Sequence, residues 1–252
     1  MTMLKAGKMN EIADQMLKTE LQIIALQELK WTGVGQINKT KYTLYYSCNL
    51  EKTGQLGTGF IIRNEIKKNI LSFEPHNERL CKLRIKGRFN NLSIISAHAP
   101  TEEKTEEEKE KFYEDLQIFH NKIPKHDIVI ILGNFNAKIG KEDVYQNVAG
   151  KHTLHEITNR NGEWVCEYAT ANNMKIISNF YQHKRIHKGT WMSPDGNMLN
   201  QIDHVIIDAN KKGVVEDVRT MRGLNCDSDH FLVKTIIKQK LIRMQMKTIK
   251  QR

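Results

Sequence analysis

Residues Asp127 to Ala137 read Asp-Ile-Val-Ile-Ile-Leu-Gly-Asn-Phe-Asn-Ala. The five consecutive aliphatic residues leave no polar face, so they predict a strand inside a sheet that is covered on both sides. Gly133 then allows the backbone to turn sharply. Alternation points the amides of Asn134 and Asn136 to one side and the Phe135 ring to the other. The stretch predicts a polar site at the end of a buried strand, although an ordinary exit from a strand into a polar loop gives the same pattern.

The length and composition favour one large α/β domain. The 252 residues contain no Pro/Gly/Ser-rich linker and no internal repeat. No apolar run approaches the roughly 20 residues that a membrane span needs, and the amino terminus lacks the features of a secretory signal. The four cysteines are scattered without C-x-x-C spacing, which argues against a zinc site or a disulfide framework. We therefore expect a soluble, intracellular monomer without a membrane partner, for which a nuclear location is plausible.

Positive charge is concentrated at the carboxyl end. The formal net charge is +10, and residues 238–252 contribute six cations and no acid. We expect a domain over residues 1–237 followed by a basic tail over residues 238–252. Clustered cations displace counterions from phosphate backbones, so Lys238, Lys240 and Arg243 are candidate contacts to DNA. A disordered tail that only increases solubility has the same composition.

Several other segments are predicted to form the scaffold. Apolar residues at helical spacing indicate an amphipathic helix over residues 8–19. Thr101 precedes a run of acids, which predicts the start of a second helix with a solvated acidic face that Pro124 closes. Residues 42–46 and 58–62 read as two scaffold strands.

Two buried strands lead into polar residues. The strand that begins near Leu21 ends on the carboxylate of Glu28, and strand ends are where α/β proteins keep their sites. The strand Leu92–Ala97 stops at Pro100, which cannot donate to the ladder, and leaves His98 at the rim. A lone glutamate is usually solvated and an isolated rim histidine is usually structural, so both residues need partners to form a site.

The last third of the chain adds an acid and an acid–imidazole pair. Asp203 lies among aliphatic residues, where an unpaired carboxylate would be costly. Asp229 and His230 stand side by side just before the buried strand Phe231–Ile237. An Asp-His dipeptide is common by chance, so its meaning depends on what lies near it.

Together these residues match the needs of phosphoester hydrolysis. Glu28 and Asp229 supply hard oxygen ligands of the kind that Mg²⁺ takes together with waters and phosphate. His230 can face the phosphate while Asp203 fixes its orientation and tautomer. A base at position 134 would orient and deprotonate the attacking water.

Six stretches in order resemble the motif series of the endonuclease/exonuclease/phosphatase superfamily. The resemblance spans nearly the whole chain and is strongest to the apurinic-type endonuclease domains of non-LTR retrotransposons and to craniofacial development protein 2-like proteins. The stretches are Leu26-Gln27-Glu28, His98-Ala99-Pro100, Gly133-Asn134-Phe135-Asn136-Ala137, Thr190-Trp191, Gln201-Ile202-Asp203-His204 and Ser228-Asp229-His230.

The resemblance implies a fold and a division of roles. The family fold is a four-layer α/β sandwich in which two mixed β-sheets pack face to face between helices. In that fold Glu28 would bind Mg²⁺, or Mn²⁺ in its place, and Asp229 would assist at the metal. His230, oriented by Asp203, would contact the scissile phosphate.

The resemblance also assigns supporting roles. Asn136 would help to position the phosphate or the nucleophile. Trp191 matches an aromatic residue near the nucleic-acid surface, where it can stack or pack beside a flipped nucleotide. His98 stands at the rim where many relatives have tyrosine.

Two departures from the family pattern bear on activity. Asn134 replaces the aspartate that activates water, and an amide has the shape of a carboxylate without its charge or basicity. The family begins with a strand that carries a Trp-Asn pair, and we expect this first strand to be missing here, since the chain starts at Met1-Thr2-Met3.

The sequence leaves two classes of function open. One is a Mg²⁺-dependent endonuclease acting on DNA, of retrotransposon origin, with activity reduced or lost. The other is a non-catalytic nucleic-acid-binding or vestigial protein. A phosphatase acting on inositol lipids shares the chemistry, but the retroelement-like segment Thr190–Gly196 argues against it.

Overall fold

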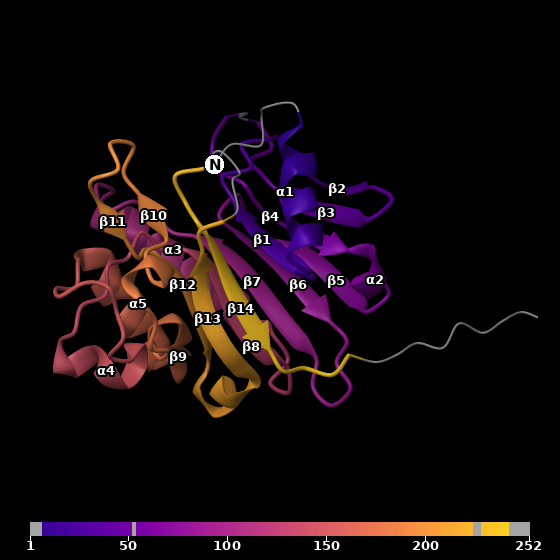
Figure 1. Cartoon of the computed structure of the whole chain (residues 1–252). Coiled ribbons are helices and arrows are strands. Elements are labelled where there is room, and N and C mark those ends of the chain that lie inside the picture. The colour runs from indigo at the N-terminus through magenta and orange to yellow at the C-terminus, as the bar shows by residue number, and fades with distance from the viewer. Residues whose placement is uncertain (1–6, 52–53, 224–227, 242–252) are drawn as a thin grey trace, which may run out of the picture.

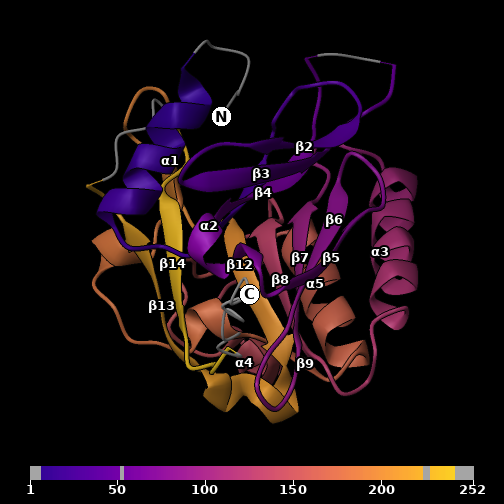
Figure 2. The ribbon, with the colours of Figure 1, turned by 90° about the vertical axis from the view of Figure 1, so that its right-hand side faces the viewer.

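The computed structural model describes residues 7–51, 54–223 and 228–241. Two β-sheets pack face to face, and helices cover the outer surface of each (Figures 1 and 2). Three apolar clusters fill the spaces between the layers, one between the two sheets and one beneath the helices on either side. The chain therefore forms the four-layer α/β sandwich that its sequence predicts.

The smaller sheet has four strands in the order β1-β4-β3-β2, all antiparallel to their neighbours, so the prediction of two mixed sheets is correct only for the larger one among the described strands. Helix α1 lies on its outer surface, where Ile12 and Met16 pack against Ile24 and Leu26. The elements of this half are α1 (Lys8–Lys18), β1 (Ile23–Gln27), β2 (Val34–Asn38), β3 (Tyr42–Ser47), β4 (Thr58–Arg63) and the short α2 (Asn64–Lys67).

The larger sheet has six strands in the order β5-β6-β7-β8-β12-β9 and is mixed, because β7 and β8 run parallel. Helices α3 and α5 cover its outer face (Figure 2). Its strands are β5 (Ile70–Pro75), β6 (Leu80–Ile85), β7 (Leu92–His98), β8 (Ile128–Asn134), β9 (Met174–Ile176) and β12 (Asp203–Asp208), and its helices are α3 (Glu106–Asn121), α4 (Asp143–Ala149) and α5 (Arg160–Ala171).

Two hairpins complete the described part of the chain. Strands β13 (Val215–Met221) and β14 (Leu232–Ile237) pair with each other and pack on the same face of the larger sheet as the smaller sheet does. Strands β10 (Trp191–Met192) and β11 (Leu199–Asn200) form a short hairpin at the other end of the molecule from the tip of β14 (Figure 1). Three short 3₁₀ helices connect these described elements: η1 (Ile177–Asn179), η2 (Arg185–His187) and η3 (Ala209–Val214).

Strand β8 lies in the interior of the larger sheet, as its aliphatic run predicts. Ile131 faces the helical layer and Ile130 faces the smaller sheet, and both are fully buried. Phe135 turns into the helical layer and is also fully buried. Gly133 is required for close packing, since a Cβ atom there would lie 1.9 Å from the carbonyl oxygen of Ala97 on β7. The strand is therefore fixed firmly up to the point where Asn134 begins the polar loop.

The start of helix α3 differs from the sequence prediction. The helix begins at Glu106 rather than after Thr101, because Thr105 and Glu108 form a capping box that satisfies two backbone amides. Thr101 instead begins a turn in which its carbonyl oxygen accepts a hydrogen bond from the Lys104 amide. A threonine followed by acids describes both positions, so sequence alone did not separate them.

Candidate active site

Strand ends bring the predicted residues to one edge of the larger sheet. In the parallel pairing of β7 and β8, His98 lies opposite Asn134, and in the antiparallel pairing of β8 and β12, Asn134 lies opposite Asp203. A cavity of about 600 Å³ opens beside this row. Glu28, Asn134, Asp203 and His230 all line it. Residues spread over two hundred positions of sequence therefore share one polar wall.

Asp203 and His230 form a direct polar contact in this wall. Nδ1 of His230 lies 3.0 Å from Oδ2 and 3.3 Å from Oδ1 of Asp203. Burial opposes protonation of the imidazole, but the charge and hydrogen bond of Asp203 outweigh it and raise the pKa of His230. The pair is therefore arranged to keep His230 protonated to a higher pH than a free histidine.

Thr190 fixes the backbone that carries Asp203. Its hydroxyl oxygen accepts hydrogen bonds from the amides of Ile202 (3.0 Å) and Asp203 (3.1 Å), and the residue is almost fully buried. Its backbone carbonyl accepts from the Phe231 amide at 2.7 Å. Sequence reasoning placed Thr190 in a motif without a role, and a buried threonine beside Trp191 gave no signal of one. The structure shows that it ties Asp203 to the segment that carries His230.

Asp229 is held by the β10–β11 hairpin. Its Oδ2 accepts a hydrogen bond from the indole Nε1 of Trp191 at 2.8 Å, and its carbonyl accepts from the Met192 amide at 2.9 Å. Burial favours the neutral acid, but the Trp191 hydrogen bond and the charge of His230 outweigh it and lower the pKa of Asp229. Trp191 thus positions an ionised carboxylate beside His230.

Glu28 and His98 face each other at the end of β1. Oε1 of Glu28 lies 3.9 Å from Nε2 of His98, and Oε2 lies 3.4 Å from Nζ of Lys30. Partial burial opposes ionisation of Glu28, but neighbouring cationic groups outweigh it and lower its pKa. Burial lowers the pKa of His98 to about 4. His98 is therefore neutral near pH 7, and its Nδ1 has no hydrogen-bond partner among the described residues.

The two asparagines hold the loop that follows β8. Oδ1 of Asn134 accepts a hydrogen bond from the Asn136 amide at 2.9 Å, and Nδ2 of Asn136 donates to the Ala99 carbonyl at 3.0 Å. Asn136 has φ 51°, in the left-handed region that asparagine tolerates better than most residues. Both amides therefore shape the loop, and of the two only Asn134 belongs to the lining of the cavity.

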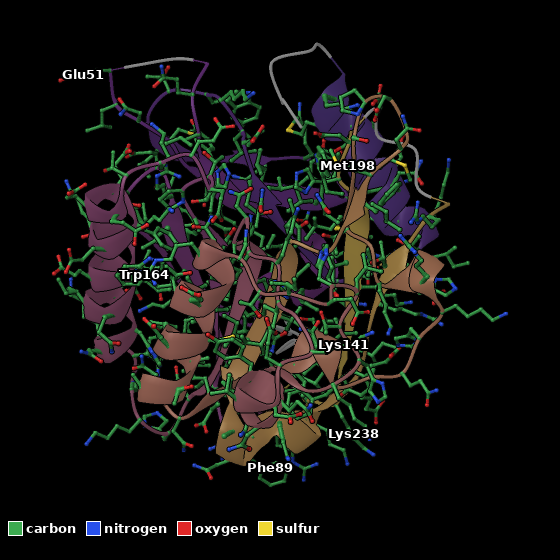
Figure 3. The ribbon with its side chains drawn as sticks, turned by 90° about the vertical axis from the view of Figure 1, so that its left-hand side faces the viewer. Glu51, Phe89, Lys141, Trp164, Met198 and Lys238 are labelled. Carbon is green, nitrogen blue, oxygen red and sulfur yellow. The ribbon has the colours of Figure 1, made fainter. Side chains whose placement is uncertain are left out.

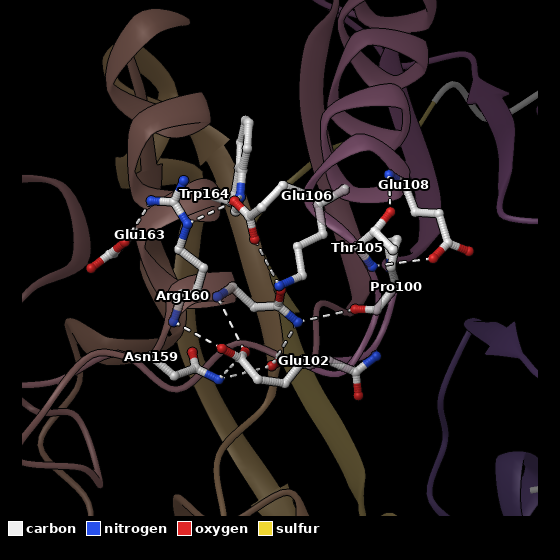
Figure 4. A network of polar contacts seen from close by, with 12 residues as sticks. Pro100, Glu102, Thr105, Glu106, Glu108, Asn159, Arg160, Glu163 and Trp164 are labelled. Atoms are coloured by element: carbon white, nitrogen blue, oxygen red, sulfur yellow. Dashed lines mark hydrogen bonds and ion pairs between the residues drawn. The ribbon is translucent and has the colours of Figure 1, made fainter.

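The amino end of α5 clamps the loops that follow β7 and β8 (Figure 4). Nδ2 of Asn161 donates to the carbonyls of Pro100 (3.0 Å) and Asn136 (3.2 Å). Glu102 accepts from the Arg160 amide at 3.1 Å, and Glu106 accepts from the Arg160 guanidinium at 2.8 Å. These acids are exposed, as predicted for a solvated face, and Glu102 and Glu106 in addition link the segment that leads into α3 to the start of α5.

The donor atoms in the cavity decide which metal it can hold. Glu28 supplies a carboxylate and Asn134 an amide oxygen to the same wall. Across residues 7–51, 54–223 and 228–241, no three His, Cys, Asp or Glu side chains lie close enough together to hold a metal ion. Mg²⁺ is commonly bound by one or two carboxylates and several waters. A single carboxylate is compatible only with a largely hydrated Mg²⁺ or Mn²⁺, which Glu28 would hold.

The structure places the predicted tail contacts away from this wall. Lys238 is exposed at the opposite end of the molecule from Met198 of the β10–β11 hairpin (Figure 3). Its Nζ lies 3.5 Å from Glu216, and the carbonyl of Lys240 accepts from the Arg88 amide. Strand β14 separates them from His230 by six residues, or about 20 Å. Arg243 lies outside the described residues.

The family model for the Endonuclease/Exonuclease/phosphatase family matches residues 4–234. The chain belongs to this family. Over 235 residues it is 31% identical to craniofacial development protein 2 of Bos taurus, a match that covers 93% of this chain and 39% of that protein. The chain thus spans about two fifths of the length of this curated relative.

Two solved structures share the fold. The endonuclease domain of TRAS1, a telomere-specific non-LTR retrotransposon, superposes with a TM-score of 0.65 at 12% identity, covering 94% of this chain and 96% of that one. The 3′ phosphatase NExo from Neisseria, bound to a product DNA hairpin, superposes with a TM-score of 0.62 at 17% identity, covering 92% and 95%. No helix within the described part of this family member is long and apolar enough to cross a membrane.

Proposed function

We propose that the chain is a Mg²⁺-dependent phosphodiester hydrolase domain acting on DNA, of retrotransposon origin, whose activity is strongly reduced. The observation that carries this proposal is the shared cavity wall of Glu28, Asn134, Asp203 and His230, in which an amide occupies the central position. The wall holds a carboxylate for a metal and a protonatable imidazole for a phosphate. It has no anionic group at the end of β8 to accept a proton from water.

Each side chain of the wall has a separate role in the proposed hydrolysis. The cation at Glu28 would neutralise charge on phosphoryl oxygens when bound. His230, kept protonated by Asp203, donates a hydrogen bond to a phosphate oxygen and stabilises the charge that develops there. Asn134 orients the attacking water through its amide but cannot deprotonate it, because a neutral amide is not a base.

Trp191, Asn136 and His98 have supporting roles. Trp191 holds Asp229 through its indole N–H and leaves its ring to pack beside a nucleotide. Asn136 shapes the loop that faces the phosphate. Neutral His98 lies beside Glu28 without competing for the cation through charge.

DNA is the substrate class that the relatives and the charge favour. One neighbour is the endonuclease domain of a retrotransposon and another carries a DNA hairpin. The net charge of +10 favours a polyanionic partner, with Lys238, Lys240 and Arg243 adding nonspecific contacts. A monomer located in the nucleus, with a domain over residues 1–237 and a basic tail, agrees with this function.

A second candidate function is nucleic-acid binding without catalysis. It is favoured by Asn134 and by the absence of three acidic or imidazole ligands around one point in the described ranges. The two functions differ in whether any cleavage depends on the site.

Nicking of supercoiled plasmid and of abasic-site DNA separates the two functions. The hydrolase proposal expects slow nicking that requires Mg²⁺ or Mn²⁺ and is lost in both Glu28→Gln and His230→Ala. Retained DNA binding with no metal-dependent nicking in the parent would establish the binding function instead. Equal nicking in the parent and both variants would identify a contaminating nuclease and remove support for the proposal.

A further inference from the structure

Glu28 has a backbone conformation that its residue type does not favour. Its φ angle is 58°, in the left-handed region where a Cβ atom crowds the neighbouring carbonyl oxygen. Such a conformation persists only where the surrounding structure holds it. The place of the Glu28 carboxylate in the cavity wall therefore depends on contacts that fix the chain on both sides of this residue.

The chain after Glu28 is fixed by backbone hydrogen bonds within the smaller half of the molecule. The Leu29 amide donates to the Gly57 carbonyl at 3.1 Å, and the Lys30 amide donates to the Leu56 carbonyl at 2.7 Å. Both acceptors belong to the segment that leads into β4. These bonds hold the turn but do not connect it to the larger sheet, which carries Asn134.

The chain before Glu28 is tied to the larger sheet by Ser96 of β7. The Ser96 hydroxyl donates a hydrogen bond to the Leu26 carbonyl at 3.1 Å and accepts one from Nε2 of Gln27 at 3.0 Å. Ser96 is fully buried and projects to the same face of β7 as Ile94, which packs in the core between the sheets. A hydroxyl in an apolar core is costly unless it is bonded. Both of these bonds go to the two residues that precede Glu28.

The same face of β7 also meets the Glu28 side chain. His98 follows Ser96 by two residues on the strand and therefore projects in the same direction. Its Nε2 lies 3.9 Å from Oε1 of Glu28. Strand β7 thus contacts the end of β1 at two points, one on the backbone before Glu28 and one at its carboxylate.

We propose that Ser96 is the positioning residue for Glu28, and that its two hydrogen bonds to the end of β1 set where the Glu28 carboxylate stands relative to Asn134 and His230. This role rests on the proposed function, in which Glu28 holds the metal ion. Ser96 is not among the described residues that line the cavity, so it acts through Glu28 and does not touch the substrate. Partners that orient a metal ligand typically change metal affinity by about 10–100-fold when they are removed.

Ser93 provides a matched control on the same strand. It is also fully buried, and its hydroxyl donates to Oδ2 of Asp127 at 2.8 Å. It stands three residues before Ser96, or about 10 Å along the strand, and projects to the opposite face. Ser93→Ala therefore removes a buried serine hydrogen bond without touching β1, whereas Ser96→Ala removes the link to Glu28.

Hydrogen exchange of the full chain without metal tests the positioning itself. The amides of Leu29 and Lys30 report on the turn around Glu28, and those of residues 129–132 in β8 report on opening of the whole domain. Relative to the β8 amides of the same protein, the Leu29 and Lys30 amides should exchange at least about tenfold faster in Ser96→Ala than in Ser93→Ala. Equal relative rates in the two variants would overturn the proposal and leave the proposed function intact.

Mn²⁺ binding, measured by the EPR signal of the free ion, tests the consequence for the metal. Ser93→Ala should bind Mn²⁺ as the parent does, and Ser96→Ala should bind it at least about tenfold more weakly. Equal affinity in the two serine variants would overturn the proposal. Equal binding by the parent and Glu28→Gln would instead contradict the proposed function, and the exchange rates would still decide whether Ser96 positions Glu28.

A second variant keeps the proposal testable if Ser96→Ala does not fold. Gln27 is only half-buried, and Gln27→Met keeps the length of the side chain while removing the amide that donates to Ser96. Exchange at Leu29 and Lys30 should rise in this variant by a smaller factor, because the bond from Ser96 to the Leu26 carbonyl remains. With Ser96→Ala unfolded, unchanged exchange in Gln27→Met would overturn the proposal.

Discussion

Asp203 lies opposite Asn134 in the pairing of β12 with β8, while its carboxylate holds Nδ1 of His230 at 3.0 Å. One acid thus connects the imidazole of the site to the sheet position where the amide stands. The charge that Asp203 places beside His230 is what keeps the imidazole protonated. The wall therefore combines a protonatable imidazole with an uncharged amide at the position where the proposed hydrolase would need a base.

Asp203→Asn should lower the pKa of His230, because the carboxylate is the main group that favours its protonated form. A histidine whose pKa is raised by folding is stabilised most below the unfolded value of about 6.5, and this stabilisation is lost as pH rises through the folded value. The stability difference between parent and variant should thus be larger at pH 5.5 than at pH 8.5. NMR titration of the His230 ring, with denaturation at both pH values, measures this, and an unchanged pKa would contradict the pairing.

Thr190→Val should destabilise the protein and disturb the site. The variant keeps the shape of the side chain but leaves the buried amides of Ile202 and Asp203 without their acceptor, at a cost of about 1–3 kcal/mol. Thr190→Ser keeps the hydroxyl and is the control. Urea denaturation compares the three proteins, and a Thr190→Val variant as stable as the parent would contradict this role of the hydroxyl.

His98 should make stability depend on pH in the acidic range. It titrates near 4 when folded and near 6.5 when unfolded, so between these values the unfolded chain binds more protons and stability falls as pH falls. At pH 5 this lowers the free energy of unfolding by about 2 kcal/mol. His98→Gln should reduce the loss of unfolding free energy between pH 7.5 and pH 5 by about that amount. An identical loss in parent and variant would show that folding does not lower the pKa of His98.

The basic tail should contribute to nonspecific DNA affinity through charge alone. Replacing its six Lys and Arg with Gln leaves Ile242, Met244 and Met246 in place and should flatten the salt dependence of binding by up to about 5 log units per log unit of salt. Lys122→Gln with Lys125→Gln, both exposed after α3, controls for a general loss of charge. An unchanged slope in the tail variant would mean that the tail does not touch DNA.

Periodicity predicted the scaffold well where burial is complete. The aliphatic run before Gly133 predicts a buried strand, and the apolar stripe of residues 8–19 predicts an amphipathic helix. Both elements are present, as β8 and α1. Strand β2 was missed because its Gly35 and exposed edge position weaken the pattern. Thr101 and Thr105 both precede acids, so the sequence pattern does not show which of them begins the helix.

Contacts between distant segments were beyond the reach of sequence patterns. The Trp191 indole reaches Asp229 across 38 positions, and Thr190 supports Asp203 from another element. Nothing local in either residue indicates its partner, because the three-dimensional fold alone brings them together.

The most direct test of the account is the rate of metal-dependent DNA nicking by Asn134→Asp. The substitution places an anionic base beside the wall of Glu28, Asp203 and His230, and general-base assistance is typically worth about 10²–10⁴-fold. We predict a gain of at least about 10²-fold over the parent, which Glu28→Gln in the same background abolishes. A parent that already nicks DNA as fast as a folded Asn134→Asp variant, with both rates abolished by Glu28→Gln, would contradict the claim that the amide at position 134 limits this site.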